Sequence, residues 1–131
     1  CFLMTVSHFR SRRRASGGRY SYRRKKLKHR GNAPVLVTIS PLKKTSLRVR
    51  AGTIKERIFT SNTVNLYDPK ERKHYTSKVE SVIESPSNRD YIRRNIMTKG
   101  CLIKTDKGVA RITSRPGQEG HINAILLKKD L

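Results

Sequence analysis

The stretch Ile122-Asn123-Ala124-Ile125-Leu126-Leu127 is almost wholly apolar, although only 34% of the 131 residues are hydrophobic. Turn residues precede it and a basic C-terminus follows it. A short apolar run that is bounded in this way predicts a strand buried on both faces. We therefore expect residues 122–127 to form the central and most buried strand of a small β domain.

The segment just before this strand, Arg115–Gly120 (RPGQEG), predicts a long turn. In it, Gly117 and Gly120 would supply positive φ angles and Arg115 would point outward. Backbone N–H groups of such a loop can bind a phosphate. However, no Lys-Ser/Thr pair follows to complete a P-loop. Nucleotide binding is therefore the weaker interpretation of this loop.

Short β-type runs, separated by turn residues, occupy most of the chain between residue 35 and this turn. In Thr45–Arg50, Leu47 and Val49 alternate with two arginines, which predicts a half-buried strand with a basic outer face. Further strands are predicted at residues 35–39, 54–60, 63–67, 75–83, 102–105 and 109–113, with hairpin turns at 68–73 and 106–108. This pattern predicts a mainly β fold, a small antiparallel β-barrel.

One short helix interrupts the strands. Ser87 and Asp90 approximate a capping box, and the helix would end near Asn95. Asp90 can form a salt bridge with one of the neighbouring arginines. We therefore expect Arg93 and Arg94 to remain able to contact phosphate.

Charge is distributed unevenly along the chain. The first acidic residue is Glu56, and the fifty-five residues before it carry sixteen Lys and Arg, eleven of them between Arg10 and Arg30. A segment with one sign of charge needs an external polyanion, and nucleic acid is the commonest polyanion in a cell. Residues 1–33, interrupted by Gly17-Gly18 and Gly31, therefore predict a long basic N-terminal extension, an RNA-binding arm that precedes a β-barrel body at residues 34–131.

The arm offers both cations and aromatic rings to RNA. Base stacking and simple packing are equally open interpretations of its tyrosines, and Arg23–Lys26 also fits a nuclear localisation signal. An inert tail is a weaker interpretation, because solvated faces usually mix charges of both signs. The expected RNA-binding residues of the arm are Arg12, Arg13, Arg14, Arg19, Tyr20, Tyr22, Arg23, Arg24, Lys25, Lys26, Lys28 and Arg30.

A second group of bases lies in the body. Four of them, Lys43, Lys44, Arg48 and Arg50, have no acidic residue beside them to offset their charge. These bases predict a barrel face that contacts RNA. Charge of this kind also protects edge strands from aggregation, which is the alternative explanation. The expected RNA-binding residues of the body are Lys43, Lys44, Arg48, Arg50, Arg93, Arg94 and Arg115.

Other kinds of site find little support. The four histidines share no metal-ligand spacing with one another or with Cys1 and Cys101. No acid stands in a catalytic motif, so we expect no enzyme activity, no cofactor and no small-molecule substrate. No apolar run reaches transmembrane length, so we expect no membrane partner. The N-terminal apolar run is too short for a signal peptide, and Met4 is a candidate initiator.

Four stretches, taken in order, carry a resemblance to a known family. They are RRRASGGR at 12–19, VNLYDP at 64–69, NRDYIRRNIMTKG at 88–100 and ARITSRPGQEG at 110–120. They resemble the S8e family of small-subunit ribosomal proteins of archaea and eukaryotes, and the compact body resembles the archaeal form. The resemblance spans about residues 11–127.

This resemblance implies a small β-barrel with a basic N-terminal extension, bound to ribosomal RNA. The expected partners are small-subunit ribosomal RNA and neighbouring ribosomal proteins, and the expected location is the ribosome in the cytoplasm. The alternative is an assembly factor of the same fold that leaves the mature particle. A general DNA-binding protein is a weaker third interpretation, because the sequence contains no helix-turn-helix or zinc finger to enter a major groove.

Overall fold

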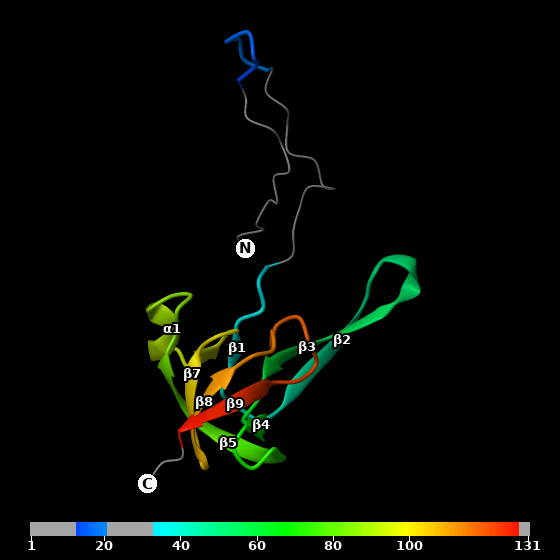
Figure 1. Ribbon diagram of the computed structural model, residues 1–131. Helices are drawn as coiled ribbons and strands as arrows, with labels where there is room; N and C mark the ends of the chain where they lie inside the picture. Colours follow the sequence, from blue (N-terminus) through cyan, green and yellow to red (C-terminus); the bar gives the residue numbers. More distant parts are fainter. Residues whose placement is uncertain (1–12, 21–32, 129–131) are drawn as a thin grey trace. The chain divides into compact units, whose positions relative to one another are not determined.

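The computed structural model describes residues 13–20 and 33–128, as Figure 1 shows. The chain divides into two compact units, Cys1–Pro34 and Val35–Leu131, and each is described by itself. Eight of the expected RNA-binding residues lie outside the described residues, namely Arg12, Tyr22, Arg23, Arg24, Lys25, Lys26, Lys28 and Arg30.

A closed barrel of five strands forms the centre of the second unit (Figure 1). Neighbouring strands along the chain pair in antiparallel fashion, and the barrel closes where the first strand pairs in parallel with the last. The small, mostly antiparallel barrel expected from the sequence is thus confirmed. Its strands are β4 (Thr63–Asp68), β5 (Lys73–Glu84), β7 (Leu102–Thr105), β8 (Gly108–Ile112) and β9 (Asn123–Lys128).

A second sheet, of four strands, accompanies the barrel. Its order is β2 (Lys43–Arg48), β3 (Ile54–Thr60), β1 (Val37–Thr38) and β6 (Ile96–Met97). Strands β2 and β3 form an antiparallel hairpin, and Figure 1 shows this hairpin reaching away from the barrel. A 3-10 turn at Arg50–Gly52 joins the two strands, and two of its residues have positive φ angles.

Helix α1 (Asp90–Arg93), the one α-helix in the described part of the chain, has only four residues. The expected capping box is absent. The side-chain oxygen of Asn88 accepts a hydrogen bond from the backbone N–H of Asp90 at 3.0 Å, whereas the Ser87 hydroxyl lies 3.3 Å from that of Thr98. The prediction of the helix was therefore correct, but its capping residue was wrong.

The core lies inside the barrel and extends to the second sheet. On β4, Val64 and Leu66 are 1% exposed, while the alternate residues Asn65 and Tyr67 face outward. Apolar residues of the other barrel strands complete the interior, and residues of the four-stranded sheet join them. Members of this core include Val37, Ile58, Leu66, Met97, Ile103 and Ile112.

The prediction that 122–127 is buried on both faces is wrong. Ile122, Ala124 and Leu126 are buried, but Ile125 is 37% exposed and Leu127 is 52% exposed. The reason is geometric: alternate residues of a barrel strand point inward and outward, so a small closed barrel buries only its inner face. A carboxylate at position 125 would therefore reach solvent and would not unfold the domain.

The prediction that β2 is half-buried is also wrong. Five of its six residues are exposed, and Leu47 is intermediate. Val49, just beyond the strand, is 40% exposed. The hairpin reaches past the barrel (Figure 1), so the alternation of apolar and basic residues along it does not correspond to a buried face and a solvated face.

A buried leucine, Leu66, and an exposed one, Leu127, provide a matched test of this core. We expect Leu66→Ala to lower the free energy of unfolding by about 2–5 kcal/mol, because it leaves a cavity inside the barrel. Leu127→Ala removes the same atoms from the outer face and should change stability by about 0.5 kcal/mol or less. Urea unfolding of the full chain measures both values. Equal losses would contradict the assignment of inner and outer faces.

Candidate nucleic-acid interface

A short turn is the described part of the basic arm. The backbone N–H of Arg14 donates to the Gly18 carbonyl at 2.8 Å, and that of Gly17 donates to the Arg14 carbonyl at 3.0 Å. Gly17 has a φ angle of +81°, which explains the glycine at this position. Arg13 and Arg19 pair as an antiparallel bridge across the turn.

An aromatic ring accompanies the cations of this turn. The guanidinium carbon of Arg14 lies 4.8 Å from the centre of the Tyr20 ring, which is a cation–π contact, and Tyr20 is 47% exposed. All of the described residues 13–20 are exposed. The turn thus presents arginines and an aromatic ring together, which are the groups that bind phosphates and stack on bases.

The bases of β2 lie on the projecting hairpin. Lys43, Lys44 and Arg48 are all exposed. The Lys44 ammonium lies 3.9 Å from a carboxylate oxygen of Glu56 on β3, so the expectation that no acid offsets these bases is wrong. Both side chains are largely solvated, and a surface pair of this kind contributes little stability. Lys44 therefore remains available to phosphate.

Position 50, the last of the expected bases in this region, belongs to the 3-10 turn at the tip of the hairpin. The structure describes its backbone and not its side chain.

Helix α1 presents a second group of bases. Arg93 and Arg94 are exposed, as is Arg89 at the N-cap. The salt bridges within the described ranges do not include Asp90, so the expected local pair with this acid is not formed. Asn95, with a φ angle of 49°, then turns the chain back, and its side-chain oxygen accepts a hydrogen bond from the Val82 backbone N–H at 3.3 Å.

The loop 115–120 presents one exposed base, Arg115, as expected. Its glycines have a different role from the predicted one, because neither has a positive φ angle. A Cβ on Gly117 would lie 2.9 Å from the backbone oxygen of Val35, and one on Gly120 would lie 2.6 Å from a carboxylate oxygen of Glu56. These glycines allow the loop to lie close against β3 and the segment before β1.

A side-chain hydrogen bond fixes this loop further. The Lys55 ammonium donates to the Gln118 side-chain oxygen at 2.6 Å. The amides of Gln118 and Glu119 both donate to the Arg115 carbonyl at 2.9 Å, so they are already used within the turn. The loop thus packs against the body and presents Arg115 outward, and these two backbone N–H groups are not free to bind a phosphate.

The expected contacts of the body do not form one continuous patch. Strand β2 is one edge of the four-stranded sheet, and β6, which follows α1, is the other edge. The bases of β2 and those of α1 therefore lie at opposite ends of this sheet. The loop that carries Arg115 packs between them, against β3 and Val35.

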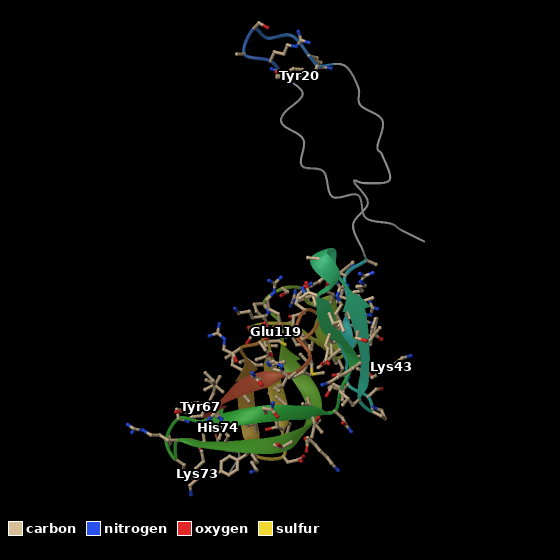
Figure 2. All side chains as sticks on the ribbon, turned by 90° about the vertical axis from the view of Figure 1, so that its right-hand side faces the viewer. Tyr20, Lys43, Tyr67, Lys73, His74 and Glu119 are labelled. Atoms are coloured by element: carbon tan, nitrogen blue, oxygen red, sulfur yellow. The ribbon has the colours of Figure 1, made fainter. Side chains whose placement is uncertain are left out.

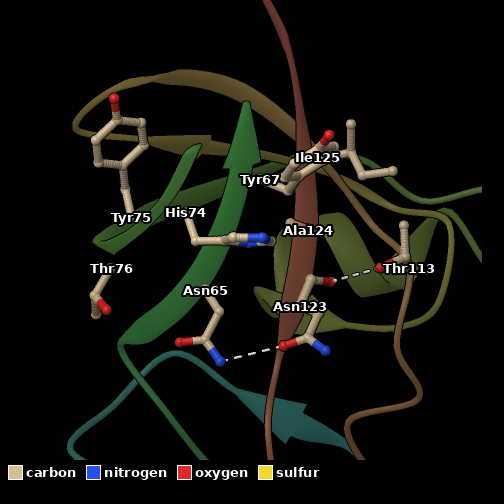
Figure 3. A pocket seen from close by; sticks show the side chains of 9 residues that line it. All are labelled: Asn65, Tyr67, His74, Tyr75, Thr76, Thr113, Asn123, Ala124 and Ile125. Atoms are coloured by element: carbon tan, nitrogen blue, oxygen red, sulfur yellow. Dashed lines mark hydrogen bonds between the residues drawn. The ribbon is translucent and has the colours of Figure 1, made fainter. Parts of the chain in front are cut away.

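Sequence reasoning missed a groove on the outside of the barrel, which Figure 3 shows from close by. The groove has a volume of about 460 Å³. Its signal was present in the sequence: outward residues of β4 alternate with the core residues, and the hairpin register sets them beside outward residues of β5. The lining residues are Asn65, Tyr67, His74, Tyr75, Thr76, Thr113, Asn123, Ala124 and Ile125.

Two side chains that could carry other chemistry are accounted for. Cys101 is fully buried, its Sγ donates to the Thr98 carbonyl at 2.9 Å, and burial raises the pKa of the thiol. His121 lies 3.9 Å from Glu119 on the surface. Within residues 13–20 and 33–128, no three His, Cys, Asp or Glu side chains gather as a metal site, and no helix there is long and apolar enough to cross a membrane.

The contacts of the loop predict a difference between its two glycines. We expect Gly117→Ala to destabilise the protein by about 1–3 kcal/mol, because the new methyl group meets a backbone oxygen that cannot move away freely. Gly120→Ala should cost less, since its nearest neighbour is the flexible end of Glu56. Thermal unfolding of both variants measures the difference. A neutral Gly117→Ala would show that the loop does not pack in this way.

Comparison with known proteins gives one consistent result. The family model of ribosomal protein S8e matches residues 7–127. The chain is 42% identical over 119 residues to the small ribosomal subunit protein eS8 of Methanocella arvoryzae, covering 90% of this chain and 95% of that protein. It is 43% identical over 119 residues to the eS8 protein of Sulfolobus acidocaldarius, covering 89% and 93%.

A third relative matches more strongly over a shorter part. The chain is 51% identical over 81 residues to the small ribosomal subunit protein eS8 of Pyrobaculum calidifontis. This match covers 62% of each chain. The same name therefore accompanies both the longer matches and the shorter one.

Proposed function

We propose that this chain, which belongs to the ribosomal protein S8e family, is a structural component of the small ribosomal subunit that binds ribosomal RNA. The observation that carries this proposal is the match of residues 7–127 to the family together with the name of the relatives. The charge agrees with it, since a formal charge of +22 needs a polyanionic partner.

The mechanism is electrostatic and architectural. The arm at residues 1–33 neutralises phosphates of RNA segments that would otherwise repel one another, and each neutralised phosphate releases condensed counterions. The barrel body docks on the RNA and positions the arm. Duplex RNA is recognised mainly by shape and by phosphate and 2′-hydroxyl contacts, so Lys and Arg can perform this without reading bases.

The described bases fit this division of roles. The turn at residues 13–20 supplies Arg13, Arg14, Arg19 and Tyr20, all exposed. The body supplies separate exposed bases at the hairpin, at α1 and at the 115–120 loop, which suits contact with several RNA segments and not with one. In this proposal the protein works in the ribosome in the cytoplasm, alongside neighbouring ribosomal proteins, and catalyses no reaction.

Co-sedimentation tests the proposal against a dissociable assembly factor. A structural component should accompany mature small subunits at one copy per particle after a high-salt wash. Presence on precursor particles alone, with absence from mature ones, would instead support the assembly factor.

The salt dependence of RNA binding tests the role of the arm. Replacing Arg23, Arg24, Lys25 and Lys26 by Gln should reduce the slope of log affinity against log salt by about 0.7–0.9 for each lost phosphate contact. The measurement is binding of the full chain to a short duplex of small-subunit ribosomal RNA. A control with the same charge change replaces four exposed lysines of the body, Lys70, Lys78, Lys99 and Lys107. Equal slopes for both variants would show that only net charge matters.

The arginines of α1 allow a second test. Arg93→Ala combined with Arg94→Ala should weaken RNA binding and lower the salt slope by about one for each lost phosphate contact. The melting temperature should not change, because both side chains are exposed and neither takes part in a salt bridge within the described part of the chain. A lower melting temperature with unchanged RNA affinity would assign these residues to internal packing.

A further inference from the structure

The outer face of the barrel carries two cross-strand rows of side chains at the groove. The parallel register of β4 and β9 pairs Asn65 with Asn123 and Tyr67 with Ile125. The antiparallel register of β4 and β5 pairs Asn65 with Thr76 and Tyr67 with His74. Directly paired residues project from the same face of a sheet. The groove therefore has one amide–hydroxyl row and one aromatic row.

The aromatic row offers a stacking surface. The rings of Tyr67 and His74 lie with their centres 4.9 Å apart and their planes 34° apart. His74 is exposed and Tyr67 is intermediate, so the pair is open to solvent on the barrel surface. Ile125, 37% exposed, adds an apolar neighbour. An exposed aromatic pair with an apolar neighbour suits the flat face of an unpaired base.

The amide row offers hydrogen-bonding groups beside this surface. The Asn65 side-chain N–H donates to the Asn123 side-chain oxygen at 3.2 Å (Figure 3). This bond uses the Asn65 amino group and the Asn123 oxygen. The remaining groups, the Asn65 oxygen and the Asn123 amino group, make no hydrogen bond with the described residues. If both side-chain amides are flipped, donor and acceptor exchange places, but one oxygen and one amino group are again left without a partner in the pair. The row thus presents an acceptor next to donors.

That combination is what a base edge requires. Each base carries a hydrogen-bond donor next to an acceptor on its Watson–Crick edge, and asparagine side chains commonly bind such pairs. A volume of about 460 Å³ lies within the range of small-ligand pockets and admits a nucleotide.

The charge of the surroundings also favours RNA over a peptide. None of the nine described residues that line the groove is acidic. At its border, β8 pairs Arg111 with Ile125, and Lys73 precedes His74 in β5. Both bases are exposed. An uncharged groove with cations at its border matches a nucleotide, whose base is neutral and whose phosphate is anionic.

A purely structural role is the competing explanation, because cross-strand pairs such as Tyr67–His74 stabilise many sheets. That role does not require exposed rings, or two asparagines whose remaining groups lack partners. We propose that this groove binds a single unpaired nucleotide of RNA, with its base stacked on the Tyr67–His74 pair and its edge hydrogen-bonded to Asn65 and Asn123. This inference rests on the proposed function, to which it adds a site that contacts a base and not only phosphates.

The test compares single-stranded with duplex RNA. The probes are a short oligoadenylate and an RNA duplex of equal length, and the full chain is titrated with each. His74→Ala should reduce affinity for oligoadenylate by about 5- to 150-fold, as loss of one stacked base contact does, and should leave duplex affinity unchanged. Asn65→Ala should act in the same direction through the lost edge contact.

Both substituted side chains are exposed, so the variants should fold, and thermal melting verifies this. His121→Ala is the matched control, because it removes an exposed histidine from a loop outside the groove and should affect neither probe. Unchanged binding of oligoadenylate by both groove variants, or equal losses on both probes, would overturn the inference and leave RNA binding intact. If the wild-type chain bound neither probe, the proposed function itself would fail, and this inference with it.

Discussion

The parallel pairing of β4 with β9 is the constraint on which the rest of the structure depends. It joins strands that are 58 residues apart at Asn65 and Asn123, and it closes the barrel. By pairing Leu66 with Ala124, its register directs apolar residues into the core. A slip of one residue would exchange inner and outer side chains along the whole strand. The same register therefore determines the core and the composition of the outer groove.

The small core also explains where the charge is placed. A chain with a formal charge of +22 repels itself, and a body of this size has limited apolar burial with which to oppose the repulsion. In the described body, the expected RNA-binding bases occur on the projecting hairpin, on α1 and on a loop, and all of those with described side chains are exposed. The fold thus exposes these cations to solvent at three separate places of the body.

Much of the fold could be predicted from the sequence because many of its strands and turns depend on residues that are neighbours in the sequence. Strands β3 and β7 begin and end where the sequence pattern predicts them, at residues 54–60 and 102–105, and the turn before β8 follows from Asp106, Lys107 and Gly108. What failed depends on long-range contacts. Strand β6 has only two residues and exists because Val37 and Thr38 pair with it. The two exposed faces, on β2 and β9, could not be distinguished from buried faces by composition alone.

The glycines of the 115–120 loop show the same limit. A glycine in sequence suggests a positive φ angle, but Gly117 is required by the backbone of Val35, which is remote in the sequence. The candidate site divides in a similar way. The single sign of charge in the arm can be recognised from the sequence alone. The groove can be recognised only when the registers of β4 with both β5 and β9 are known. Only the outward alternation within β4 could have indicated it.

The two kinds of contact proposed here place different demands on the scaffold. A phosphate contact tolerates displacement, because the Coulomb energy changes slowly with distance and Lys or Arg side chains can follow a moving phosphate. A base contact depends on hydrogen-bond distance and angle, so small displacements remove it. Cations can therefore be carried by a projecting hairpin, a four-residue helix and the basic arm. Groups that recognise a base need neighbouring strands held in fixed register. In the described body, the closed barrel provides this, and it is on the barrel that Asn65, Tyr67 and His74 lie together.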